Sequence, residues 1–339
     1  MPILVQSMSH KLRLNPGPAP FALLLLKQCR SHKRSRLFVS LLLGLFCISM
    51  LCAPSQAEPL YVSFSLGGNA TSAVNMRSRS NDRASICDEY INPRAISVIG
   101  CNTTTRGTGD GWSAPFNSGS GFSATAELGY HFSPRFRLAL AYGYQTTDFH
   151  QTVSSTDATG ADFDKISNEL SVGQETLGNV TAQQLFAIAY RDWPNRSQWT
   201  PFAGVGVGLT QMRKDFSWVW ARSIDPADIL SGRDQPNAEE IVGNLAGTVS
   251  TGRSTPQDTM TGLMLIGGVS RQLTERVALD LMARWQHFSD FESDAFGGGV
   301  LRSHPPNLRL DGSEPVSTWT RTEDTNRYSV MLSLRIAFP

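Results

Sequence analysis

The chain has 339 residues, of which 40% are hydrophobic and only 17% charged, and its mean hydropathy is −0.19. This composition is too polar for a bundle of membrane helices and too apolar for a disordered chain. The 29 Gly, 18 Pro and 9% aromatic residues favour short strands and turns over helices. Residues 58–339 carry 23 Lys and Arg against 29 Asp and Glu, so their net charge is negative, they show no basic footprint for nucleic acid, and nucleic acid is not an expected partner.

Residues 1–57 are predicted to be a secretory signal peptide behind an N-terminal extension. Three of the four residues 33–36 are basic, an apolar run from Leu37 to Cys52 follows, and the small residues Ser55 and Ala57 come next. The translocon and signal peptidase require this order, so cleavage is expected after Ala57. An uncleaved membrane anchor is the alternative, but the run has about 16 residues and a span needs about 20.

Two cysteines remain in the exported part of the chain, Cys87 and Cys101, because the other three of the five lie before residue 58. An oxidising compartment favours a disulfide between them. The bond would close a loop of about 15 residues and contribute roughly 3 kcal/mol against the unfolded chain. Two cysteines without a nearby histidine make a poor metal site, so neither a metal nor a cofactor is predicted.

Residues 58–339 contain eight segments in which apolar and polar side chains alternate. The clearest segment, Tyr328 to Phe338, has apolar side chains at every even position and a more polar set at the odd ones. The apolar sets predicted for the other faces include Leu60, Val62, Phe64 and Leu66; Ala124, Ala126, Leu128 and Tyr130; Phe136, Leu138 and Leu140; Phe186, Ile188 and Tyr190; Ala203, Val205, Val207 and Leu209; and Val277, Leu279 and Leu281. A sixth segment, at about 258–270, is apolar on both faces and leaves its register open.

The connections between these segments alternate between short and long. Short links fall near residues 133–135, 194–198 and 272–275, and the long ones are about 70–120, 150–179, 216–256 and 289–325. The prediction is an all-β fold: an eight-stranded antiparallel transmembrane β-barrel with short periplasmic turns and four long extracellular loops, formed by residues 58–339. Lipid tolerates no open sheet edge, so the first and last strands must pair and both termini are expected in the periplasm.

A soluble sandwich would alternate in the same way, but its polar face would meet water and favour Lys. Residues 58–339 contain only two lysines, which is typical of an enclosed lumen. The aromatic residues add a second indication, because this arrangement sorts them into two girdles at the two membrane interfaces. The turn-side girdle is Phe132, Phe136, Trp193, Trp199 and Phe338, and the loop-side girdle is Tyr142, Tyr144, Phe149, Phe216, Trp218, Trp285 and Tyr328.

Three segments carry a resemblance to a known family: the strand-turn-strand Gly129–Leu138, the strand Pro201–Gly208 and the terminal Leu334–Phe338. Together they resemble the small outer-membrane barrels of the opacity-protein, OmpX and surface-antigen type. The resemblance implies a location in the outer membrane of a Gram-negative cell, with outer-membrane lipid and lipopolysaccharide around the barrel. It also implies recognition by the outer-membrane assembly machinery through a C-terminal signal of Tyr328 and Phe338. Such chains usually end in Phe, whereas here Pro339 follows.

The lumen of an eight-stranded barrel is only wide enough for side chains to fill it. The inward set includes the charged residues Glu127, Arg137, Asp280, Arg284 and Arg335. Charges in such an interior have to pair. We expect them to plug the barrel, and the alternative is that they form the filter of a narrow pore for small solutes.

One arrangement in the sequence has the logic of a nucleophile. His287 and Ser289, with Glu292 or Asp294 to orient the imidazole, resemble the pair used by outer-membrane lipid A deacylases, in which serine attacks an ester and histidine is its base. A histidine beside Trp285 at headgroup level needs no chemistry, however. The expectation is a protein that is not an enzyme, with a lipid hydrolase as the alternative.

The long loops hold more than half of residues 58–339 and are expected to carry the function. The prediction is a non-enzymatic surface protein or antigen, whose extracellular loops mediate adhesion or contact with a host or other cell-surface ligand. A structural role in the envelope is left open beside adhesion, and the sequence names no ligand.

Overall fold

The computed structural model describes residues 60–81, 85–97, 101, 111–157, 169–293, 304–323 and 325–338. The chain divides into two compact units, Met1–Gln56 and Ala57–Pro339. The predicted signal peptide lies outside the described residues. None of the helices in the described part of the chain is both long and apolar enough to cross a bilayer.

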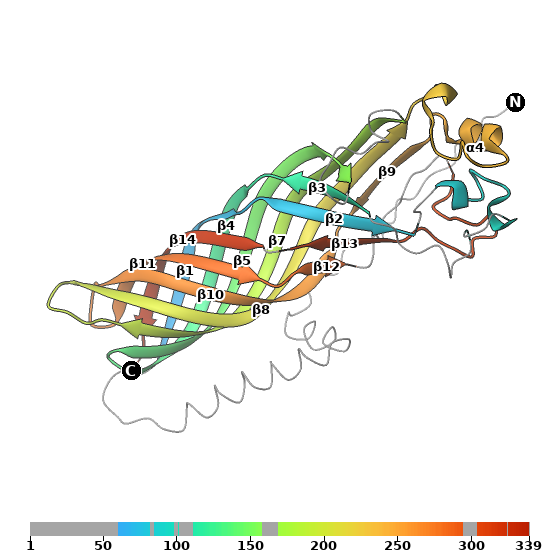
Figure 1. Cartoon of the computed structure of the whole chain (residues 1–339). Coiled ribbons are helices and arrows are strands. Elements are labelled where there is room, and N and C mark those ends of the chain that lie inside the picture. The colour runs from blue at the N-terminus through green and yellow to red at the C-terminus, as the bar shows by residue number, and fades with distance from the viewer. Residues whose placement is uncertain are drawn as a thin grey trace, which may run out of the picture. The chain divides into compact units, whose positions relative to one another are not determined.

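Eight antiparallel strands of the second unit form a closed ring (Figure 1). The first strand pairs with the last, so that Tyr61 faces Ala337, and β8 pairs with β10 to complete the ring. No strand of the ring is left with an open edge, and the predicted fold class is confirmed. The eight strands are β1 (Leu60–Thr71), β4 (Gly119–Ser133), β5 (Phe136–Ser154), β7 (Leu170–Asp192), β8 (Trp199–Arg222), β10 (Gln257–Gln272), β11 (Val277–Phe288) and β14 (Asn326–Ala337).

One end of the barrel, here called the turn end, carries only short connections. The links are residues 134–135, 193–198 and 273–276, close to where the sequence places them. The backbone N–H of Phe338 donates to the carbonyl of Leu60 at 2.8 Å, so the first and last strands are joined up to the same end. The opposite end is called the loop end.

A band of apolar side chains covers the outside of the barrel next to the turn end. Phe64 and Leu66 on β1 and Val330 and Leu332 on β14 are exposed, while the residues between them along each strand are buried. On β8 the outward side chains are apolar up to Leu209, and the next ones, Gln211, Arg213 and Asp215, are polar. The band therefore ends after about ten residues of strand, which is the length that crosses the hydrocarbon core of a bilayer.

Segments predicted as loops contain more strand than expected. Beyond the apolar band β5, β7 and β8 continue, and β9 (Val249–Ser254) pairs with β8. The predicted boundaries at about 70–120, 150–179, 216–256 and 289–325 therefore cut into regular structure. A second sheet adds to this, in the order β12 (Phe291–Ser293), β13 (Thr318–Thr322), β2 (Val74–Ser80), β3 (Trp112–Phe116) and β6 (Thr156–Asp157).

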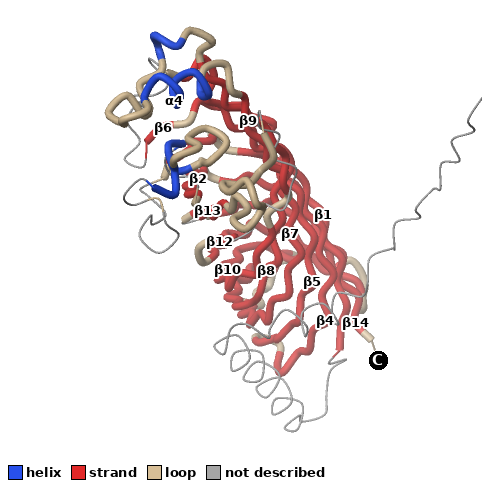
Figure 2. The backbone as a smooth tube through the Cα atoms, turned by 90° about the vertical axis from the view of Figure 1, so that its right-hand side faces the viewer, coloured by secondary structure: helices blue, strands red, loops and turns tan. Residues whose placement is uncertain are grey.

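The loop end carries a group of short helices, here called the cap and defined as the described residues of 85–101, 224–247 and 304–317 (Figure 2). Helix α4 (Ala238–Leu245) lies in this cap. Its buried face packs against Ile91 of the segment 85–101 and against Ile229, which precedes the helix in its own segment. The cluster consists of Ile91, Ile229, Ile241, Val242 and Leu245. The 3-10 helices are η1 (Ser85–Cys87), η2 (Ala95–Ser97) and η3 (Pro226–Asp228).

The face predicted for β7 is wrong. Phe186, Ile188 and Tyr190 are buried in the lumen, and the smaller Ala187 and Ala189 face outward. Neighbouring glycines explain the inversion, because Phe186 lies opposite Gly208, Ile188 opposite Gly206 and Tyr190 opposite Gly204. A Cβ atom at Gly204 or Gly208 would lie 2.7 Å from the ring of Tyr190 or Phe186. Gly204, Gly206 and Gly208 therefore make room for the large inward side chains of the adjacent strand β7.

The loop-side aromatic girdle is smaller than predicted. Tyr142, Tyr144 and Tyr328 are exposed on the outer surface as expected. Phe149 and Phe216 are buried, and Trp218 packs against the same core. These three residues follow the apolar band along β5 and β8, where the inside of the barrel is still a packed core.

Candidate functional site

The lumen nearest the turn end is filled by ion pairs. The Nε atom of Arg137 lies 3.0 Å from Oδ2 of Asp192, and both side chains are buried. Its guanidinium also lies over the rings of Tyr190 and Phe202, 4.3 and 4.9 Å from the ring centroids. The sequence left Arg137 to share Glu127 and Asp280 with the other lumen arginines and missed Asp192, because Asp192 has the same parity as Tyr190, which was predicted to face outward.

A second pair lies on the other side of the same lumen, between β14 and β11. Arg335 approaches Asp280 with Nη2 3.3 Å from Oδ1, and the same nitrogen donates to the hydroxyl of Ser270 at 2.8 Å. The ring of Tyr61 lies beside that of His131, with the centroids 4.8 Å apart and the planes tilted by 53°. Charged and aromatic groups together fill this level.

The third pair spans the barrel one level further in. Nη2 of Arg284 lies 2.8 Å from Oε1 of Glu127, and Nη1 donates to the hydroxyl of Thr125 at 2.9 Å. The hydroxyl of Tyr190 donates to the same carboxylate at 3.1 Å. All five predicted lumen charges therefore have partners of opposite charge, two pairs as expected and one through Asp192. Full pairing with extra hydrogen bonds is what makes a buried ion pair tolerable.

Three glutamines close the lumen above these pairs. Nε2 of Gln145 donates to Oε1 of Gln286 at 2.9 Å, and Nε2 of Gln286 donates to Oε1 of Gln184 at 2.9 Å. Nε2 of Gln184 donates back to Oε1 of Gln145 at 3.4 Å, which completes a cycle between β5, β11 and β7. Nη1 of Arg327 donates to Gln145 at 3.0 Å. We call Gln145, Gln184 and Gln286 the glutamine ring.

Beyond the apolar band the lumen holds a buried lysine, Lys214. Nζ of Lys214 donates to the hydroxyl of Thr322 at 2.6 Å and lies 3.8 Å from the ring centroid of Phe291. Within the described part of the chain no carboxylate reaches ion-pair distance of Lys214 or of Arg327. Burial, with the like charge of Arg327, lowers the pKa of Lys214 to about 7.

The candidate catalytic residues do not form a triad. Nδ1 of His287 lies 3.1 Å from Oδ1 of Asn326, and its ring stacks against Trp285. The hydroxyl of Ser289 accepts the backbone N–H of Thr261 at 3.2 Å. Among the described residues no hydrogen bond joins His287 to Ser289.

Of the two residues considered as orienters of the imidazole, Glu292 lies near an arginine. Oε1 of Glu292 lies 3.6 Å from Nε of Arg321. Asp294 lies outside the described residues.

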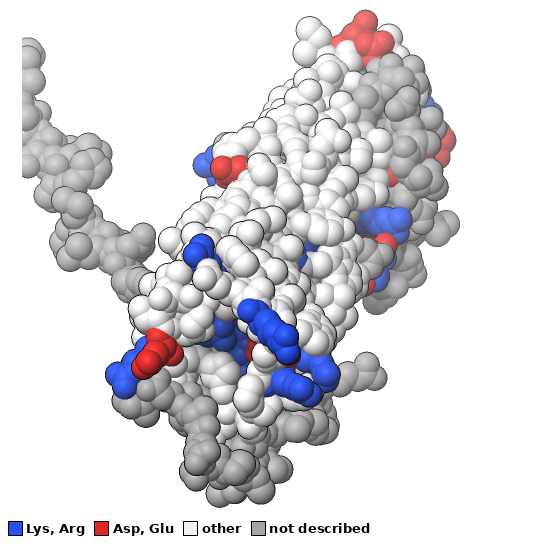
Figure 3. Space-filling model, turned by 90° about the vertical axis from the view of Figure 1, so that its left-hand side faces the viewer, with Lys and Arg blue, Asp and Glu red and all other residues white. Residues whose placement is uncertain are grey.

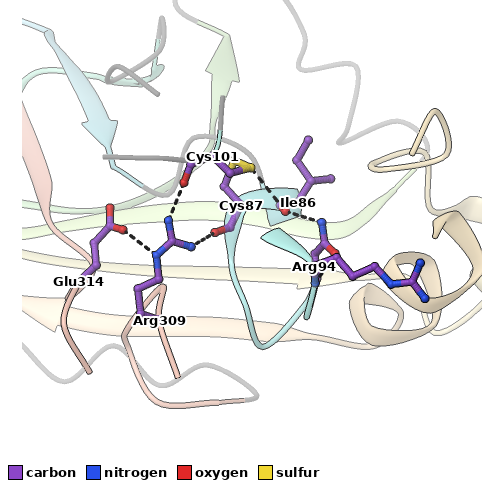
Figure 4. The surroundings of a disulfide bond; sticks show 7 residues. Ile86, Cys87, Arg94, Cys101, Arg309 and Glu314 are labelled. Carbon is purple, nitrogen blue, oxygen red and sulfur yellow. Dashed lines mark hydrogen bonds and ion pairs between the residues drawn. A yellow bond between two sulfur atoms is a disulfide. The ribbon is translucent and has the colours of Figure 1, made fainter. Parts of the chain in front are cut away.

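The cap is fastened by the predicted disulfide and by an arginine (Figure 4). Cys87 and Cys101 are bonded, with their Cα atoms 5.1 Å apart. Arg309, from a distant part of the chain, donates to the backbone carbonyls of both cysteines, at 3.1 Å for Cys87, and its Nε lies 3.3 Å from Glu314. One side chain therefore fixes both ends of the disulfide loop.

Two further contacts tie the same segments together. Nε2 of His304 lies 3.0 Å from Oδ2 of the buried Asp88, and the His304 ring stacks on Tyr90 with centroids 4.5 Å apart. The carboxylate of Glu89 accepts the backbone N–H of Leu310 at 2.8 Å. The first and last long segments thus form one fastened surface.

The remaining predicted site residues are placed as follows. Tyr328 and Phe338, the predicted assembly signal, are exposed on the outer face of β14 and just after it. Across the described ranges, no group of three or more His, Cys, Asp or Glu side chains is arranged to hold a metal ion.

Comparison with family models and with curated protein sequences finds no match. Among solved structures the chain is similar to Neisserial surface protein A, with 13% identity, a TM-score of 0.34 and coverage of 81% of this chain and 97% of that one. It is similar to the outer membrane protein OprG from Pseudomonas aeruginosa, with 11% identity, a TM-score of 0.41 and coverage of 83% and 97%. The outer membrane protease OmpT from Escherichia coli gives 11% identity, a TM-score of 0.28 and coverage of 85% and 99%. These likenesses concern the fold and say nothing of activity.

Proposed function

We propose that the protein is a non-enzymatic surface protein of the outer membrane that acts through contacts made by its cap. The observation that carries the proposal is the fastening of the cap, in which Arg309 holds both ends of the Cys87–Cys101 loop. A surface that is cross-linked and packed loses little conformational entropy when a partner binds. A disulfide and several polar contacts thus hold a surface outside the barrel in one conformation.

The apolar band supports the membrane placement. Its large side chains would be costly in water and are stable in lipid, and the closed ring leaves no backbone polar group of an edge strand unpaired. In this placement outer-membrane lipid and lipopolysaccharide surround the band, the turn end lies in the periplasm, and the cap faces the exterior. The outer-membrane assembly machinery is the expected partner for insertion.

The contacts inside the barrel favour a closed lumen rather than an open pore. Three ion pairs and the glutamine ring occupy successive levels between the turn end and the cap. An ion crossing the barrel would have to break these contacts. The hydrogen bonds of His287 to Asn326 and of Ser289 to Thr261, with none between His287 and Ser289 among the described residues, likewise favour a binding protein over a lipid hydrolase.

Four large apolar side chains of the cap are exposed and are the best candidates for partner contact. Ile224 is 86% exposed, Ile96 73%, Leu310 61% and Leu230 49%. Exposed apolar side chains on a fastened scaffold are typical of protein-binding surfaces. A protein ligand on another cell surface is the partner class that such side chains fit.

The test compares adherence of intact Gram-negative cells that display the wild type or the variant I96S/I224S/L230S/L310S. We expect the apolar variant to lose at least about tenfold in binding to a monolayer of epithelial cells, since losing 1.4 kcal/mol costs a factor of ten. The matched control is D234S/E239S, which changes exposed polar residues of the same cap and should adhere like the wild type. Surface display is equalised by labelling with an antibody against an epitope tag.

Equal adherence of the apolar variant and the wild type at equal display would contradict the proposal. The structural role is separated by a second measurement on a strain that lacks the protein. If such a strain becomes sensitive to detergent, and the apolar variant restores resistance as well as the wild type does, the envelope role replaces adhesion.

A further inference from the structure

Arginines gather at the turn end of the barrel, where basic side chains cluster in Figure 3. Arg135, Arg191, Arg196 and Arg271 are all exposed there. Among the described residues none of the four forms an ion pair with a carboxylate. The acidic residues nearby do not offset them, because Asp192 is buried against Arg137 and only Glu275 is exposed in the short links.

Two of these arginines are held against the turn-side aromatic girdle. The guanidinium of Arg191 lies 5.0 Å from the ring centroid of Phe136 and 5.9 Å from that of Trp193. The guanidinium of Arg271 lies 5.5 Å from the ring centroid of Trp199. Cation–π contacts of this kind fix the charge at the level of the aromatic rings.

The girdle marks where the apolar band ends, and aromatic side chains there sit at the headgroup level of a bilayer. Arg191 and Arg271 occupy outward positions on β7 and β10, in register with the apolar side chains of the band. Their charges therefore face the headgroups of the adjoining leaflet. A guanidinium can donate two parallel hydrogen bonds to one phosphate group.

We propose that Arg191 and Arg271, with Phe136, Trp193 and Trp199, form binding sites for the phosphate groups of anionic phospholipids in the leaflet next to the turn end. The aromatic rings contact the acyl chains and glycerol region, and the guanidinium groups bind the phosphate. Arg135 and Arg196 add positive charge beside these sites. The inference rests on the membrane placement proposed above.

The test uses the full barrel purified in micelles that contain equal amounts of phosphatidylglycerol and phosphatidylethanolamine, followed by native mass spectrometry. We expect the wild type to retain phosphatidylglycerol at least about fivefold over phosphatidylethanolamine, and R191Q/R271Q to lose this preference. The matched control is R213Q/R253Q, which removes two exposed arginines on the loop side of the apolar band and should keep the preference. An excess of inorganic phosphate should leave the bound lipid in place.

Failure of this inference is distinguishable from failure of the membrane placement. Each variant is first incorporated into vesicles and tested for resistance of the barrel to trypsin. A resistant wild-type barrel without lipid preference, or a R191Q/R271Q variant that keeps the preference, overturns the lipid sites alone. Displacement of the lipid by inorganic phosphate overturns the lipid as the source of the phosphate group.

Discussion

The indole N–H of Trp112 on β3 donates a hydrogen bond to the carboxyl group of Glu175 on β7. Glu175 is only 1% exposed, and its second carboxyl oxygen has no hydrogen-bond partner among the described residues. It lies beyond the apolar band, between the barrel and the second sheet. Burial raises the pKa of Glu175 to about 8, although the bond from Trp112 acts in the opposite direction.

Glu175→Gln should stabilise the protein at alkaline pH. The raised pKa means that the folded state holds a proton that the unfolded chain releases above its ordinary pKa of about 4.3. Wild-type stability therefore falls as pH rises from about 4.3 to about 8, whereas the glutamine variant has no such loss. The gain of the variant over the wild type should be about 2 kcal/mol larger at pH 9 than at pH 6. Unfolding by guanidinium in lipid vesicles, followed by tryptophan fluorescence, measures the free energy of unfolding of both proteins. An equal gain at both pH values would contradict the raised pKa of Glu175.

Lys214→Met should show the opposite pH dependence. Because the pKa of Lys214 is lowered to about 7, the unfolded chain takes up a proton that the folded chain lacks at every pH between about 7 and 10.4. The destabilisation of the wild type by the buried lysine is therefore largest below pH 7 and disappears above pH 10.4. Methionine should therefore stabilise the protein at pH 6 by about 4 kcal/mol more than at pH 10, because the pKa of Lys214 differs from its unfolded value over about three of these pH units. The same unfolding titration reports it, and a gain that grows with pH would refute the argument.

The filled lumen predicts an electrically silent barrel. Purified wild type in planar bilayers should give no sustained porin-like steps, because Arg137, Arg284 and Arg335 are paired across the interior. A general porin recorded under the same conditions is the positive control. Large, stable single-channel steps would mean that the lumen opens and would favour the pore.

Both thiols of the cap should be unreactive on intact cells. A membrane-impermeant maleimide is expected to label neither Cys87 nor Cys101 until a reductant is added. The Arg309→Met variant should keep the disulfide but expose the loop to trypsin, because the two cysteine carbonyls lose their shared donor. Mass spectrometry of the peptides shows whether either cysteine carries the label. If trypsin cleaves the Arg309→Met variant no faster than the wild type, the role of Arg309 in holding the loop is contradicted.

Purified protein should leave lipid A and phospholipid esters intact. A serine hydroxyl needs a base to remove its proton, and the nearest base candidate, His287, is bonded to Asn326. The measurement is release of fatty acid during incubation with both substrates. Release that is abolished by His287→Ala or by Ser289→Ala would replace the binding protein with a hydrolase.

The ring of strands could be predicted from the sequence because lipid outside and polar groups inside impose a period of two over ten residues. The rule failed on β7, where Phe186 and Tyr190 are as apolar as an outward set. Only the register with Gly204 and Gly208 reveals that they have space inside, and register is a property of two strands together.

The site was predictable to a similar degree. Charges on inward faces identified the five residues that have to pair in the lumen, but only the structure shows that Arg284 pairs with Glu127 and Arg335 with Asp280. Asp192 has the same parity as Tyr190, so the wrong face predicted for β7 placed it outside the barrel as well. The glutamine ring left no such trace, because an uncharged amide at an inward position is compatible with any partner until the levels of three strands are known.

The pairing of β1 with β14 has a consequence for assembly. The hydrogen bond from Phe338 to Leu60 joins two residues almost at opposite ends of the second unit. The contact that closes the ring therefore joins residues that are among the farthest apart in the sequence. Every earlier hairpin can form locally, but until β14 is present β1 and β11 each expose a row of unpaired donors and acceptors. Such a chain folds slowly and must be kept from aggregating while it waits for its last strand.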